Sequence, residues 1–420
     1  MRLVRVAAAA LIVALISLWS ACGEYYRPVA YPLTPTQPNP SFTHQAVVIT
    51  TNGTTNPGAS TTIDVSGDTA ISEATVGIMP VHAALLSSIT RVFVANILDD
   101  TVSVFSPFSP TPVITISLPA GSAPDFVAST ETATVYVANS GNSTVAAIST
   151  SSNVITNTIT VGGSPVSMSE TPDGQKVYVA NAGVGGGAAS VVSINTTDDS
   201  VNPPIVASTT APWTSPVWVA SRSDSQRAYV LDKGSGFVSA IDTFVDVVKA
   251  TASVGVGADY MFYDPTLDRL YVTNPATNIV TVLDASTDAL APMTASVANP
   301  ITVTALLDGT RAYVATAAVS GTTVSSSVTV LNSNDLSVKT VIPLTALPAI
   351  CTTKAPSELS IASAADSSRV YVANCDAGNT AVIQTSNDTL LLTLPAPLGA
   401  FSPPSTTPPS QKPVFVLAGP

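Results

Sequence analysis

Charged residues are scarce in this 420-residue sequence, and histidine is almost missing. Only 10% of the residues are charged, and the two histidines are His44 and His82. A histidine-rich metal site is therefore excluded, and no spacing of cysteine, histidine or acidic residues resembles a zinc or calcium signature. The 15 basic residues are outnumbered by 27 acidic ones, for a formal charge of −12. Because no basic patch exists and this charge repels phosphate backbones, a nucleic-acid partner is not expected.

Helical patterns and catalytic motifs are missing as well. No run of ten or more residues has a convincing helical period, whereas Val, Thr, Ile and Ser dominate, which favours an all-β domain. The glycine-rich segment from Gly183 to Gly187 joins two expected strands and opens no helix, so a phosphate cradle is not expected there. No serine lies in a nucleophile-elbow context. We therefore expect no cofactor and no metal, and the sequence favours binding over catalysis.

The N-terminus has the features of a secretory signal. A basic start with Arg2 and Arg5 precedes an apolar run from Val6 to Leu18, which is too short to span a bilayer comfortably. Removing the two arginines with the signal changes the formal charge from −12 to −14. The mature protein is thus expected to be acidic and extracytoplasmic, and its acidity is typical of a soluble surface.

The end of this signal resembles that of a bacterial lipoprotein. In Leu18-Trp19-Ser20-Ala21-Cys22, small residues precede a cysteine, and the resemblance implies that residues 1–22 are the signal and that Cys22 is lipidated. Gly23 in place of Asp fits outer-membrane sorting in such families. The expected location is therefore the cell envelope, on its periplasmic or surface face, with the lipid as the only membrane attachment. Trp19 stands where those families usually have Leu, which leaves ordinary signal cleavage as an alternative.

Residues 23–45 are expected to form a tether between the membrane and a single domain at 46–420. The stretch from Tyr25 to Phe42 contains five prolines and little periodicity, as is typical of an extended linker. The alternative is that this stretch packs on the domain.

A short aromatic motif recurs along that domain. Near-copies of Val177-Tyr178-Val179-Ala180-Asn181 have their aromatic residue at positions 93, 136, 178, 229, 271, 313 and 371, in steps of 43, 42, 51, 42, 42 and 58 residues. Around each copy, turn residues such as Thr171-Pro172-Asp173-Gly174 separate short strand-forming segments. The unit from Pro165 to about Val206 contains four such segments, the fourth at Val201–Ala207. A period near 40 of this kind predicts a β-propeller of four-stranded blades.

These motifs resemble the YVTN family of β-propeller repeats. Tyr271-Val272-Thr273-Asn274 reproduces the name motif. Seven complete units lie between Pro80 and about Pro395. Segments at 49–52, 62–65 and 74–77 supply strands two to four of another unit, and segments at 399–401 and 413–417 supply one or two more strands. Because an open blade leaves unpaired edges, the sequence predicts eight blades, one of them shared by the two termini. Seven blades with the N-terminal strands as an accessory is the alternative.

The candidate ligand site lies on the first strand of each blade, which is innermost in propellers. One and three places after the Pro that starts each unit, or after Ala258 in the unit without that Pro, the residues are mostly apolar and are expected to form core. Two places after it every blade differs, and we expect these residues to line one mouth of the channel: His82, Phe126, Ser167, Trp218, Tyr260, Thr302 and Glu358. Trp218 and Tyr260 are expected to form an aromatic platform for a sugar face or an apolar ligand.

Several alternatives to this site stay open. The ring of residues would merely plug the channel, or the ligand surface would be formed by the loops 182–188 and 317–326, with a protein, a small molecule or a carbohydrate as partner. Some propellers related to the family are lactonases, and here His82 and Glu358 would be the only channel-facing acid and base. The shared blade would separate them, which weakens that hydrolase hypothesis.

Two cysteines remain once Cys22 is set aside. Cys351 lies in the long connection before the last motif and Cys375 directly follows that motif. In an oxidising compartment such a pair predicts a disulfide, in preference to a reactive or metal-binding thiol pair.

Overall fold

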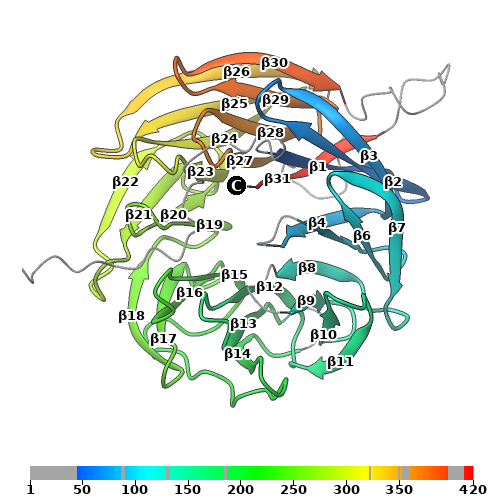
Figure 1. Cartoon of the computed structure of the whole chain (residues 1–420). Coiled ribbons are helices and arrows are strands. Elements are labelled where there is room, and N and C mark those ends of the chain that lie inside the picture. Colours follow the sequence, from blue (N-terminus) through cyan, green and yellow to red (C-terminus); the bar gives the residue numbers. More distant parts are fainter. Residues whose placement is uncertain are drawn as a thin grey trace, which may run out of the picture. The chain divides into compact units, whose positions relative to one another are not determined.

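A computed structural model describes residues 45–86, 90–128, 133–183, 187–320, 323–348, 351, 359–395 and 411–419, which form an eight-bladed β-propeller (Figure 1). The described residues contain strands and no helix, so none of their elements is a helix that could cross a membrane. The all-β prediction is confirmed, and eight blades replace the alternative of seven. The signal, Cys22 and the tether up to residue 44 lie outside the described residues.

The first four blades follow one another along the chain, each with its first strand innermost. Their strands are, for blade 1, β4 (Pro80–Leu85), β5 (Val92–Asn96), β6 (Thr101–Ser106) and β7 (Ser109–Ser117); for blade 2, β8 (Pro124–Ala128), β9 (Thr134–Asn139), β10 (Thr144–Ser149) and β11 (Ile155–Thr160); for blade 3, β12 (Pro165–Glu170), β13 (Lys176–Asn181) and β14 (Ser190–Asn195); and for blade 4, β15 (Pro216–Ser221), β16 (Arg227–Asp232), β17 (Phe237–Asp242) and β18 (Val247–Ser253).

The remaining blades complete the ring. Their strands are, for blade 5, β19 (Tyr260–Asp264), β20 (Arg269–Asn274), β21 (Ile279–Asp284) and β22 (Pro292–Ser296); for blade 6, β23 (Pro300–Ala305), β24 (Arg311–Ser320), β25 (Thr323–Asn332) and β26 (Val338–Pro348); for blade 7, β27 (Leu359–Ser363), β28 (Arg369–Asn374), β29 (Asn379–Gln384) and β30 (Thr389–Pro395); and for blade 8, β31 (Lys412–Ala418), β1 (Gln45–Asn52), β2 (Asn56–Asp64) and β3 (Thr69–Ile78).

Blade 8 closes the ring with strands from both ends of the described chain. Its order is β3-β2-β1-β31, and β31 pairs antiparallel with β1, with Val48 opposite Val416. The innermost strand of this blade therefore follows every other strand in the sequence, while its three outer strands precede them. The predicted shared blade is confirmed, whereas the segment at 399–401 lies outside the described residues.

Blade 3 differs from the others at its outer edge. The segment predicted as its fourth strand runs along β14, because the Asn202 N–H donates to the Ser193 carbonyl and the Ile205 N–H to the Val191 carbonyl, each at 2.9 Å. Between these bonds lie Pro203 and Pro204, which have no N–H to donate. The segment therefore covers the edge of β14 without becoming a regular strand.

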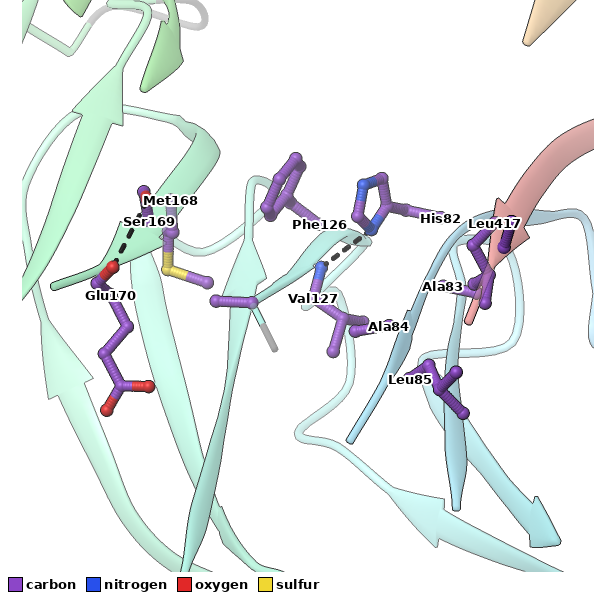
Figure 2. A pocket seen from close by; sticks show the side chains of 12 residues that line it. His82, Ala83, Ala84, Leu85, Phe126, Val127, Met168, Ser169, Glu170 and Leu417 are labelled. Atoms are coloured by element: carbon purple, nitrogen blue, oxygen red, sulfur yellow. Dashed lines mark hydrogen bonds between the residues drawn. The ribbon is translucent and has the colours of Figure 1, made fainter. Parts of the chain in front are cut away.

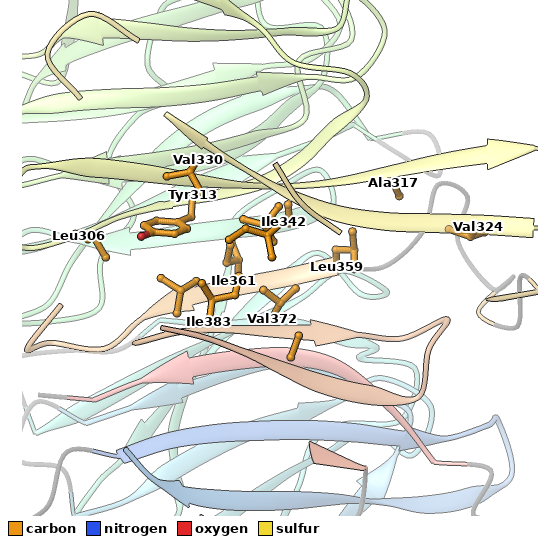
Figure 3. Packing of buried hydrophobic residues seen from close by; sticks show 14 residues of the cluster. Leu306, Tyr313, Ala317, Val324, Val330, Ile342, Leu359, Ile361, Val372 and Ile383 are labelled. Atoms are coloured by element: carbon orange, nitrogen blue, oxygen red, sulfur yellow. The ribbon is translucent and has the colours of Figure 1, made fainter. Parts of the chain in front are cut away.

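The hydrophobic core lies between neighbouring blades. At the joint between blades 6 and 7, Tyr313 and Val330 pack with Ile361 and Val372, and all four are nearly inaccessible to solvent (Figure 3). Each buried side chain of this size contributes about 2 kcal/mol by leaving water. Because such a joint forms between every pair of blades, the motif strands are buried throughout.

The aromatic of the motif also forms a polar contact with the next blade. The hydroxyl of Tyr371 donates to Asp68 of blade 8 at 3.0 Å, and Arg369 donates to the same carboxylate at 2.9 Å. Asp68 lies in the turn between β2 and β3 with a positive φ of 50°, a conformation that Asp tolerates better than most residues. We call this arrangement of a tyrosine, a basic residue and a turn aspartate the joint latch.

Two other joints contain the complete latch. Asp246 accepts from Lys176 at 2.8 Å and from Tyr178. Asp388 accepts in the same way from Arg311 and Tyr313. The repeated aromatic is therefore selected both for burial and for a hydrogen bond across the joint.

Candidate functional site

Five of the seven varied residues predicted at the channel, His82, Phe126, Ser167, Trp218 and Thr302, lie on innermost strands directly after a break in register, whereas Tyr260 begins β19 without one. In blade 1, Pro80 pairs with Asn96, but His82 already pairs with Ala95, so Val81 forms a β-bulge. The same shift follows Pro124, Pro165, Pro216 and Pro300. The residues three places after the Pro are buried as predicted, with exposures of 0–4% from Ala83 to Leu359.

The varied residues turn toward the following blade. The Val127 N–H of blade 2 donates to His82 Nδ1 at 3.3 Å. In the same way, the Val219 N–H of blade 4 donates to the hydroxyl of Ser167 at 3.1 Å, and the Thr302 hydroxyl donates to the Leu359 carbonyl at 3.0 Å. These side chains therefore link innermost strands around the ring. Glu358 lies outside the described residues.

The large members of this set form a continuous line of aromatic rings. The ring centroids of His82 and Phe126 are 3.9 Å apart and stacked, those of Phe126 and Trp218 are 5.9 Å apart and edge-on, and those of Trp218 and Tyr260 are 4.6 Å apart and tilted. Phe126 reaches Trp218 because blade 3 contributes only the small Ser167 between them. Trp218 and Tyr260 are half-buried, so part of each ring is available to a ligand.

A fifth ring, Phe415, was not predicted. Its centroid lies 4.5 Å from that of His82. Pro413 pairs with Thr50 and Phe415 with Ile49, with a register shift between them, which is the same arrangement as Pro80 and His82. The spacing Pro413-Val414-Phe415 could have revealed it, since the aromatic again stands two places after a proline. We call Phe415, His82, Phe126, Trp218 and Tyr260 the aromatic arc.

His82 is a neutral member of this arc. Burial lowers the pKa of its imidazole from 6.5 to about 3, because the charged form loses its hydration. Since Nδ1 accepts the bond from Val127, the neutral ring has its hydrogen on Nε2. At neutral pH this histidine packs as an aromatic ring with one outward donor, and it is poorly suited to act as a general base.

A cavity of about 360 Å³ opens beside the arc, along β4, β8, β12 and β31 (Figure 2). His82 and Phe126 border one end of it, and Glu170 lies at the other end in the view of Figure 2. Ala84, Ala128 and other small residues of the innermost strands leave the space open. Glu170 was not predicted as a site residue, because it stands five places after Pro165, whereas the predicted ring stands two places after the start of each unit.

The disulfide predicted between Cys351 and Cys375 is present, with the Cα atoms 5.9 Å apart. The Cys351 N–H also donates to Asp376 at 3.0 Å. Both contacts attach the connection that follows β26 to the turn after β28.

In the alternative ligand loops, residues 184–186 and 321–322 lie outside the described part. In the second of these loops, the described residues of β24 and β25 pair as far as Ser320 and Thr323.

No group of three or more histidine, cysteine or acidic residues in the described ranges is arranged to hold a metal ion. The ring, the closing strand and the arc define the protein as an eight-bladed β-propeller with an aromatic channel wall.

No protein-family model and no curated protein matches the chain. Solved propellers do match it. Dihydro-heme d1 dehydrogenase NirN, in complex with DHE, has a TM-score of 0.64 at 11% identity and covers 89% of this chain and 74% of its own. AztD from Citrobacter koseri has a TM-score of 0.62 at 10% identity, over 90% of this chain and 99% of its own.

A Bacteroides fragilis protein named as a candidate 6-phosphogluconolactonase has a TM-score of 0.55 at 11% identity, over 91% of this chain and 100% of its own. At these identities the likeness shows the fold alone.

Proposed function

We propose that the protein is a ligand-binding β-propeller of the YVTN type, attached to the bacterial envelope through a lipid on Cys22, and that its ligand contacts the aromatic arc. The pair of Trp218 and Tyr260 carries this proposal, since two half-buried rings, with centroids 4.6 Å apart and planes inclined by 51°, offer apolar ring surface to a sugar or an aromatic ligand.

An extracytoplasmic location is supported by the disulfide. Cys351 and Cys375 are bonded, and structural disulfides persist mainly in oxidising compartments such as the periplasm and the cell surface. The lipoprotein-like sequence ending at Cys22 supports attachment to the outer membrane.

A lactone hydrolase is the weaker proposal. It would need His82 as an acid or base, but the pKa of His82 is lowered to about 3 by burial and its Nδ1 is occupied by the Val127 N–H. Turnover of a lactone panel that disappears in Glu358→Gln would favour the hydrolase over the binding module.

The binding proposal is tested with a carbohydrate array and flat aromatic probes. We expect the ligands bound by the wild-type protein to bind about 30-fold more weakly to the double variant Trp218→Ala/Tyr260→Ala, because each of the two aromatic contacts contributes about 1 kcal/mol. Because both rings also pack against neighbouring blades, Trp218→Phe serves as a second variant that keeps the packing.

The matched control is Phe244→Ala, which removes an aromatic ring that is 91% exposed in the turn between β17 and β18. Undiminished binding by folded arc variants would contradict the proposal. Loss of a partner complex only after truncation of the 317–326 loop would instead support a scaffold that uses its loops.

A further inference from the structure

The described residues that line the cavity beside the arc include one carboxylate side chain, that of Glu170, and no lysine or arginine. The Glu170 residue is only 9% exposed, so its charge is weakly screened by solvent. Since His82 is neutral at pH 7, the cavity has no positive group to receive a phosphate or a carboxylate.

The remaining lining is apolar. Phe126, Met168, Leu85 and Leu417 contribute ring, thioether and aliphatic surface, and Ser169 supplies a hydroxyl near Glu170. A volume of about 360 Å³ is at the lower end of the range for ligand pockets. The cavity thus fits a small molecule with an apolar body and one polar end.

The unit next to Glu170 also differs from the other units at a position that is otherwise basic. Two places before the aromatic residue of the motif, six units have a basic residue: Arg91, Lys176, Arg227, Arg269, Arg311 or Arg369. Blade 2 has Thr134 at this position. In that blade Tyr136 donates to Asp199 at 2.9 Å. Burial, the bond to Asp199 and the charges of Asp199 and Glu170 all raise the pKa of Tyr136, so two carboxylates act on this buried region.

We propose that this cavity binds a small organic cation, an ammonium group on an apolar body, with the ammonium directed toward Glu170 and the body against Phe126 and Leu417. The inference rests on the proposed function, because it assigns a ligand class to the cavity that lies beside the aromatic arc. It also distinguishes this channel from a site for phosphorylated sugars, which would need basic residues.

Calorimetry with three probes that share a phenylethyl body tests the charge preference: protonated 2-phenylethylamine, neutral 2-phenylethanol and anionic 3-phenylpropionate. We expect the amine to bind the full chain at least about tenfold more tightly than the alcohol, and the acid to bind more weakly than both, as a buried charge pair requires. In Glu170→Gln the advantage of the amine should disappear while the alcohol is unaffected.

Glu73→Gln is the matched control, since it removes the same charge from β3, outside the cavity. A second variant, Thr134→Arg, restores the basic residue of the other units and should weaken the amine alone. Equal binding of amine and alcohol, or an amine affinity that survives Glu170→Gln, overturns the inference. If no probe binds while array ligands still depend on Trp218 and Tyr260, the inference fails and the proposed function stands.

Discussion

At the scale of single residues, one repeated position holds chemically different side chains that nevertheless share a task. His82, Ser167 and Thr302 each bond to the backbone of the next innermost strand, whereas the Trp218 ring packs at a tilt against the Tyr260 ring of the next blade. The differences among blades at this position, which suggested a ligand site, thus also reflect which group of the next blade each side chain contacts. Both roles are compatible for Trp218 and Tyr260, because each of these side chains stays partly exposed.

The titration of His82 gives a direct check on this environment. Its pKa is lowered to about 3, so between about pH 6.5 and pH 3 the unfolded chain binds a proton that the folded chain does not. The free energy of unfolding should therefore fall as the pH falls through this range, and His82 should contribute no pH dependence above it.

The measurement is an NMR titration of the imidazole signals, assigned with His82→Gln, together with urea unfolding at several pH values. In His82→Gln this part of the acid destabilisation should be absent. A His82 signal that titrates near 6.5 would contradict the buried neutral ring.

At the scale of elements, the sequence predicted the strands well because their signals are local. Each motif strand of blades 1 to 7 has an aromatic residue and the first strand of a blade usually begins at a proline, so the fold and the positions of Trp218 and Tyr260 followed from spacing. The contact between Phe126 and Trp218 could not follow, since it depends on three blades. Phe415 was missed because the motif strand of blade 8, Val47-Val48-Ile49-Thr50, has lost both the aromatic and the asparagine that align the other units.

The connection between blades 6 and 7 depends on its disulfide. Replacing Cys351 and Cys375 by serine should lower the free energy of unfolding by roughly 2–4 kcal/mol, because the bond closes a loop with a sequence separation of 24 residues. Urea unfolding measures this loss, and Cys22→Ser is the control that removes the third cysteine and should leave the stability of the propeller unchanged. Equal stability of the double variant and wild type would show that the disulfide does not constrain the fold.

At the scale of the whole molecule, the joint between blades 7 and 8 differs from the others because it connects the two ends of the described chain. Asp68 holds Arg369 and Tyr371 across a sequence separation of about 300 residues. The equivalent Asp246 holds Lys176 and Tyr178 within a continuous part of the chain.

Asp68→Asn and Asp246→Asn should both lower stability, by about 1.5–3 kcal/mol, because each weakens hydrogen bonds to a charged group. Hydrogen exchange should distinguish them. In Asp68→Asn the amides of β1 and β31 should exchange faster than those of the other blades, since the ring opens at its closing joint. Uniform exchange in both variants would contradict a special role for this joint.

The position of β31 also has a consequence for the making of the protein. This strand is synthesised after every other described strand. Until then, the edge of β1 that faces away from β2 has no strand to pair with. An unfilled edge of that kind invites pairing with other chains. The time that passes before β31 pairs with β1 would therefore set how much of the newly made protein aggregates.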